Sequence, residues 1–126
     1  MDSIESWSDW IGPVLSAKEV QQILGLERVE EVSRLAAKGL LLELSGGSGE
    51  TGYPSFQFTT RRTIPGLQEI LLVFNRHGID RYTIASWFQT SSSFLDSLSP
   101  ASWLRAGREP SAAIIAAVRS ATELSA

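Results

Sequence analysis

The stretch that most constrains the fold runs from residue 95 to residue 107 and reads Leu-x-x-Leu-x-Pro-x-x-Trp-Leu-x-x-Gly. Pro100 suits the first turn of a helix, where its missing N–H group would have no partner, and Ser99 suits the N-cap before it. Gly107 is typical of the residue that follows a helix end. The spacing therefore predicts a short helix whose inner side carries Trp103.

A longer helix is expected after this array. It begins near Pro110, and Ile114, Ile115 and Val118 recur at the spacing of a helical apolar stripe. Alanines lie on both sides of the stripe, and such small side chains let another backbone approach closely. That backbone can belong to the same chain or to a partner, and the sequence favours neither.

Two further helices are predicted before the array. Apolar residues at positions 67, 70, 71 and 74 indicate a helix that starts at Leu67 and stops before Gly78. Asp80 has the position of an N-cap, and the helix that follows it ends with Trp87-Phe88. The second half of the chain is therefore expected to form a small α-helical bundle.

This half of the chain resembles the C-terminal toxin-binding domain of Xre/MbcA/ParS-type antitoxins. The matching residues are Gly78-Ile79-Asp80, Trp87-Phe88, the segment 98–107 and the Ala/Val/Arg-rich helix at the end. The resemblance implies an antitoxin that binds a RES-domain toxin, an enzyme that destroys NAD, and occludes its active site. The toxin-binding residues implied are Trp87, Phe88, Trp103, Leu104, Arg105, Gly107, Arg108 and Arg119. The tryptophans equally fit the core of a small helical domain.

The first half begins with a different pattern. Ser16 and Glu19 form a capping box, in which each side chain accepts a hydrogen bond from the other residue's backbone N–H group. Gly25 ends the helix that they start, and a second amphipathic stripe over residues 29–36 ends at Gly39. A helix, a brief turn and a second helix outline a helix-turn-helix.

The residues that follow predict a hairpin. Leu40 to Leu44 have the composition of a strand, residues 45–52 are rich in glycine and serine, and residues 53–58 suit a returning strand. Together with the two helices, these parts resemble a winged helix-turn-helix of the excisionase or MerR type. The expected fold is therefore mainly α: a small winged helix-turn-helix with a short β-hairpin, followed by a C-terminal α-helical bundle.

Charge argues both for and against DNA binding by this module. Residues 1–63 contain six basic side chains and nine acidic ones, and the hairpin loop carries Glu50 but no lysine or arginine. Glu27, Glu30 and Glu31 lie where the second helix begins; phosphates would repel them, although the helix dipole favours them there. The expected DNA contacts are Arg28, Arg34, Lys38, Arg61 and Arg62.

Composition limits the remaining possibilities. The chain has 126 residues, 43% of them hydrophobic, a formal charge of −3 and no cysteine, so disulfides and thiolate zinc sites are excluded. No apolar run approaches the length of a membrane span, and the N-terminus lacks the pattern of a signal peptide, so a cytoplasmic protein is expected. Pro65 and Gly66 suggest two units, residues 1–63 and 64–126. Residues 4–11 are expected to form a short amphipathic helix that docks onto the domain or contacts a partner.

No enzyme activity, metal or cofactor is expected. His77 is the chain's one histidine, and the carboxylates lack the spacing for paired acid–base work. The loop of residues 45–52 lacks the lysine of a phosphate-binding P-loop. Two functions therefore stand. The first is an antitoxin that forms a homodimer within a larger toxin–antitoxin complex and also binds operator DNA to repress its own operon. The alternative is a winged helix-turn-helix transcription regulator whose C-terminal half is a dimerisation domain.

Overall fold

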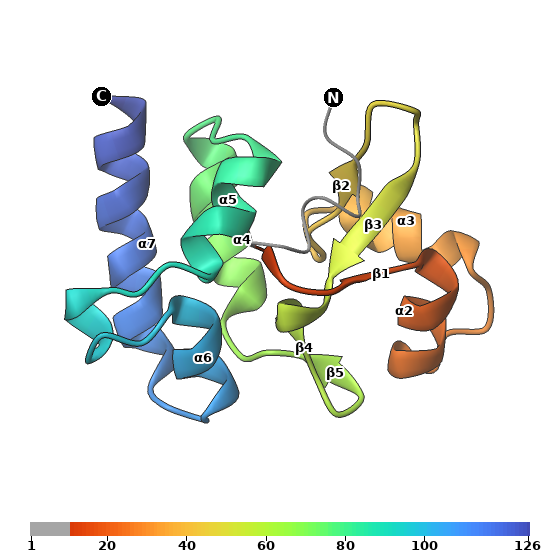
Figure 1. Ribbon diagram of the computed structural model, residues 1–126, viewed down its shortest axis with the longest axis horizontal. Helices are drawn as coiled ribbons and strands as arrows, with labels where there is room; N and C mark the ends of the chain where they lie inside the picture. The colour runs from red at the N-terminus through yellow and green to blue at the C-terminus, as the bar shows by residue number, and fades with distance from the viewer. Residues whose placement is uncertain (1–10) are drawn as a thin grey trace.

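The computed structural model describes residues 11–126, and residues 4–10 of the expected N-terminal helix lie outside this range. The helices are α2 (Ala17–Leu24), α3 (Glu30–Ala37), α4 (Leu67–Arg76), α5 (Arg81–Phe88), α6 (Pro100–Arg105) and α7 (Pro110–Ser125). Two short 3-10 turns, η1 (Ser55–Gln57) and η2 (Ser93–Leu95), interrupt the loops. The expected mainly helical class is confirmed. Helices α2 and α3 lie at one end of the molecule and α7 at the other (Figure 1).

The strands are short and antiparallel. They are β1 (Val14–Leu15), β2 (Leu44–Ser45), β3 (Thr51–Pro54), β4 (Phe58–Thr59) and β5 (Arg62–Thr63). The first three form a sheet in the order β1-β3-β2, and the last two form a separate hairpin. The predicted hairpin is present, but its first strand covers two residues instead of residues 40–44.

The helix ends follow the sequence predictions. The Ser16–Glu19 capping box is present, with backbone-to-side-chain distances of 2.9 and 3.1 Å. Asp80 caps α5, and Ser99 caps α6 immediately before Pro100. These signals were readable because each of them depends on residues within one helical turn.

The predicted apolar stripe of α7 is wrong in part. Ile115 is 61% exposed and Val118 is 44% exposed, while Ile114 is partly buried. The face that packs inward, mainly against α4, consists of alanines: Ala113, Ala116, Ala117 and Ala121. Small side chains let α7 approach the bundle closely, so the larger β-branched residues remain on the outer face.

The buried residues form two clusters that do not follow the expected boundary between residues 63 and 64. The smaller cluster comprises Val20, Val32, Ala36, Leu41, Tyr53 and Phe58. The larger cluster, formed mostly by α4 to α7, also contains Ile11, Leu42, Leu44 and Phe56. The rings of Phe56 and Phe88 stack with centroids 5.0 Å apart. The first half of the chain therefore contributes directly to the core of the second.

The segment expected to join the two units is itself structured. Residues 58–63 form the β4–β5 hairpin, and Ile64 after it is fully buried. No helix within residues 11–126 is both long enough and apolar enough to cross a membrane.

Candidate nucleic-acid interface

Helix α3 has one buried face and one face open to solvent. Val32 and Ala36 turn inward, and the helix packs against α2. The exposed residues of the helix are Glu30, Ser33, Arg34 and Ala37. They recur at the three- and four-residue spacing of a single helix face. The face opposite the core therefore carries one anion, one cation and two small side chains.

The two glutamates at the start of α3 have different surroundings. The Glu31 carboxylate accepts a hydrogen bond at 2.8 Å from the backbone N–H of Arg28, which lies before the helix. No hydrogen bond or ion pair involves the Glu30 carboxylate within residues 11–126. Glu31 is thus held against the turn before α3, while the Glu30 carboxylate has no partner in the described residues.

The predicted DNA contacts are all exposed. Within the described part of the chain, the ion pairs are Arg81–Glu43 and Arg108–Asp96, so none of these five cations has a carboxylate partner there. Arg28, Arg34 and Lys38 cluster along α3 and the turn before it. Arg61 and Arg62 come from the β4–β5 turn, which points away from the β2–β3 loop in Figure 1.

The β2–β3 loop, residues 46–50, offers no positive side chain. The Gly46 N–H donates to the Glu50 carbonyl at 2.7 Å, which closes the turn. The Glu50 side chain occupies the space that a side chain at Gly46 would need. This loop can donate to a phosphate only through its backbone N–H groups and the Ser48 hydroxyl.

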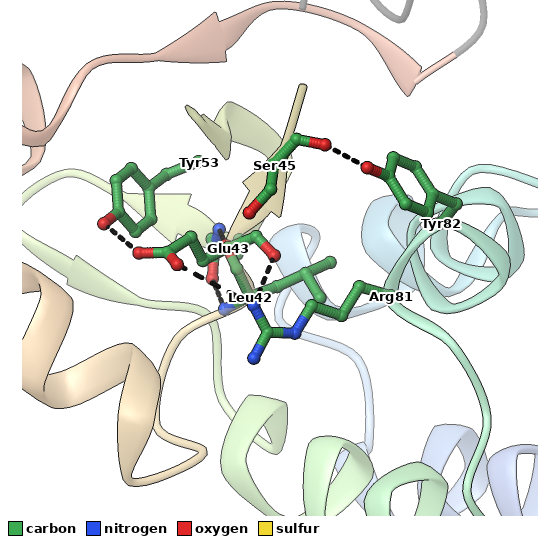
Figure 2. Close-up of polar contacts among 7 residues, drawn as sticks. Leu42, Glu43, Ser45, Tyr53, Arg81 and Tyr82 are labelled. Carbon is green, nitrogen blue, oxygen red and sulfur yellow. Dashed lines mark hydrogen bonds and ion pairs between the residues drawn. The ribbon is translucent and has the colours of Figure 1, made fainter. Parts of the chain in front are cut away.

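Polar contacts from α5 hold the base of this hairpin (Figure 2). The Glu43 carboxylate accepts a hydrogen bond from the Tyr53 hydroxyl at 2.5 Å and lies 3.7 Å from the Arg81 guanidinium. The Tyr82 hydroxyl donates to the Ser45 carbonyl. Burial, followed by the neighbouring Glu43 carboxylate, raises the pKa of Tyr53 well above its ordinary value. Contacts from Arg81 and Tyr82, in the second half of the chain, thus fix the position of the hairpin.

Gln57 is a further anchor that the sequence did not indicate. It is fully buried, and its amide group bonds to both the N–H and the carbonyl of Leu42, at 2.8 and 2.9 Å. It also donates to the Pro54 carbonyl at 3.0 Å. No local pattern distinguishes such a glutamine from an exposed one, because its partner Leu42 lies fifteen positions away.

Four of the eight residues implied as toxin contacts pack in the core. Phe88 and Leu104 are buried and Trp103 is 9% exposed. Trp87 is partly buried; its indole N–H donates to the Ser120 hydroxyl at 2.9 Å, and its ring meets Phe88 edge-on. Packing within the chain thereby explains the spacing of the array. In this conformation, these side chains are not available for contact with a partner.

The three arginines of that set are exposed but engaged within the chain. Arg105 donates to the Phe58 carbonyl at 3.1 Å. Arg108 lies 4.0 Å above the Trp103 ring and pairs with Asp96. Arg119 lies 4.6 Å above the ring of Phe94. Gly107, also exposed, follows α6 with a φ of 76°, the left-handed conformation that favours glycine.

An exposed apolar surface remains beside Arg119. Phe94 is 64% exposed and Ile115 is 61% exposed. With Ala112, Ala116 and Arg119 they line an open hollow of about 420 Å³. This surface lies on α7 and η2, at the opposite end of the molecule from α3 (Figure 1).

Residues 11–126 contain no group of three or more His, Cys, Asp or Glu side chains suited to a metal. No protein-family model matches the chain, and no curated protein matches it. Among solved structures, the chain is similar to the NMR structure of Rv2175c, with a TM-score of 0.74, 21% sequence identity, and coverage of 86% of this chain and 81% of that one. At this level of identity the likeness concerns the fold alone.

Proposed function

We propose that this protein binds DNA through a winged helix-turn-helix, with α3 as the recognition helix and the β2–β3 hairpin as the wing. The observation that carries the proposal is a set of three exposed cations, Arg34 on α3 with Arg28 before and Lys38 after the helix, that pair with no carboxylate of the described residues. Cations without protein partners are suited to phosphates and base edges.

The small number of cations sets the strength of binding. Each phosphate contact contributes about 0.9 to the slope of log affinity against log salt, so three contacts give a slope of about 2.7. A single module is therefore a weak DNA binder. Two modules would roughly double the slope and set a spacing of about one helical turn, or a multiple of it, between half-sites.

Fluorescence titration of DNA from the protein's own promoter, at several salt concentrations, tests this proposal. Arg28→Ala is expected to weaken binding and to lower the salt slope by about 0.9, because Arg28 is a proposed phosphate contact. Arg119→Ala is the matched control, because it removes the same charge from α7 at the far end of the molecule. Equal effects of both substitutions would mean that only net charge matters. No binding by the wild-type protein at low salt would refute the proposal.

A second candidate is inhibition of a RES-domain toxin, and the exposed surface of Phe94 and Ile115 beside Arg119 favours it. A partner would meet this surface, together with Arg105, Gly107 and Arg108, instead of the buried tryptophan. Co-purification with a RES-domain protein from an adjacent gene tests it. Ile115→Asp is expected to abolish the complex and Arg34→Ala to leave it intact. A complex insensitive to Ile115→Asp would exclude this surface.

A further inference from the structure

Glu30 and Arg34 dominate the outward face of α3. They are four residues apart, so their Cα atoms lie about 6 Å apart along the helix axis. At this spacing an ion pair is common, yet the two side chains make none. Ser33 directs its hydroxyl to the Glu30 carbonyl at 3.1 Å, and Ala37 has no polar group. The outward face of α3 therefore presents one carboxylate and, one turn later, one guanidinium, neither of which has a hydrogen-bond or ion-pair partner within residues 11–126.

A free carboxylate on a DNA-reading face lowers affinity for every sequence, because the phosphates repel it. The helix dipole favours a carboxylate in this first turn, and Glu31 next to it also accepts a hydrogen bond from the Arg28 N–H, whereas the Glu30 carboxylate has no partner within residues 11–126. The repulsion is offset only at a base that presents a hydrogen-bond donor. In the major groove cytosine offers its N4 amino group and no acceptor, adenine adds the N7 acceptor to its donor, and guanine and thymine present acceptors alone. The chemistry of Glu30 thus matches cytosine.

Arg34 has the complementary preference. A guanidinium donates two parallel hydrogen bonds to O6 and N7 of guanine, the commonest specific contact between a protein and a base. With base pairs stacked about 3.4 Å apart, a separation of about 6 Å spans roughly two steps. One helix face can therefore contact two nearby bases, cytosine through Glu30 and guanine through Arg34.

We propose that Glu30 is a specificity-determining residue, which selects cytosine within a site that also contains a guanine contacted by Arg34. This inference rests on the proposed DNA binding and adds what the site reads. Glu30 acts mainly by rejecting the other bases, since guanine and thymine offer it no donor and adenine places the N7 acceptor beside its donor. It weakens non-specific binding and so increases the ratio between the affinity for the preferred site and the affinity for all other DNA.

The experiment starts with selection of preferred duplexes from a randomised library by the full-length wild-type protein. Affinities for the selected site and for its single-base variants are then measured for the wild type and for Glu30→Gln. Glutamine has the same reach, carries no charge and pairs with N6 and N7 of adenine. The expected result is tighter binding to unrelated DNA and a preference at one position that moves from cytosine toward adenine, by about tenfold.

Glu123→Gln on α7 is the matched control, because it changes the net charge equally at the end of the molecule remote from α3 (Figure 1). It is expected to leave the base preference unchanged. Thermal melts of both variants show whether they fold. If Glu30→Gln strengthens binding to all sequences equally, Glu30 is merely a repelling charge and this inference is wrong, although DNA binding stands. If the wild type binds no duplex at low salt, the proposed function fails as well.

Discussion

At the scale of single residues, the array around Trp103 shows how one pattern can signal either a core or an interface. The Trp103 indole N–H donates to the Glu109 carbonyl at 2.7 Å, and the Arg108 guanidinium lies over the indole ring. The caps around the array could be predicted because a cap depends on neighbouring residues. The sequence placed the indole on the inner side of a short helix but left open whether it is core or toxin contact, since that depends on helices distant in sequence.

Replacing Trp103 with alanine removes a buried ring and leaves a cavity in the larger cluster. The free energy of unfolding is expected to fall by about 3–5 kcal/mol. Urea unfolding followed by circular dichroism measures the change, and Trp103→Phe should recover part of it. An unchanged urea midpoint would show that the indole contributes nothing to the core.

Asp80 provides a prediction about pH. Its carboxylate accepts hydrogen bonds from the Thr83 hydroxyl at 2.7 Å and the Thr83 N–H at 3.0 Å, and these bonds lower the pKa of Asp80. The stabilisation is therefore complete above the unfolded-state pKa of about 4 and is lost as the pH falls through the lower folded-state value. Asp80→Ala is expected to destabilise the protein by about 1 kcal/mol at pH 7. The difference in urea midpoint should narrow below pH 4; a constant difference would contradict the assignment.

At the scale of elements, α7 shows where pattern analysis reached its limit. Its alanines and its β-branched residues both recur at helical spacing, and periodicity predicted the helix but assigned its apolar stripe to Ile114, Ile115 and Val118. Packing decides in favour of the alanines, since α7 lies close against α4. Strand β1 was not predicted at all, because two residues carry no periodicity and its partner β3 is distant in sequence.

This packing makes the two faces of α7 respond differently to substitution. Ala117→Leu places extra volume where the helix contacts the bundle and is expected to cost about 1–3 kcal/mol of stability. Ile115→Ser lies on the exposed face and should change stability by about 0.5 kcal/mol or less. Thermal unfolding of both variants checks this, and a larger loss from Ile115→Ser than from Ala117→Leu would reverse the assignment of faces.

At the scale of the whole molecule, the halves expected from Pro65 and Gly66 share a core. Residues 64–126 alone would lose the cover that Ile11, Leu42, Leu44 and Phe56 provide. That fragment is expected not to fold cooperatively, whereas the full chain unfolds in a single transition. Dispersed amide signals in a ¹⁵N NMR spectrum of the isolated fragment would contradict this expectation. The sequence could not reveal the sharing, because a turn-forming pair looks the same inside a domain as between two.

Residues 41–44 alternate between the two clusters, with Leu41 in the smaller one and Leu42 and Leu44 in the larger. Bending the molecule here would pull a leucine out of one core or the other, and Glu43 out of its contacts with Tyr53 and Arg81. We therefore expect a partner bound at the α7 end to leave the conformation of α3 unchanged. Under the proposed DNA binding, such a partner would act by bringing a second copy of α3 to the same DNA or by blocking its approach.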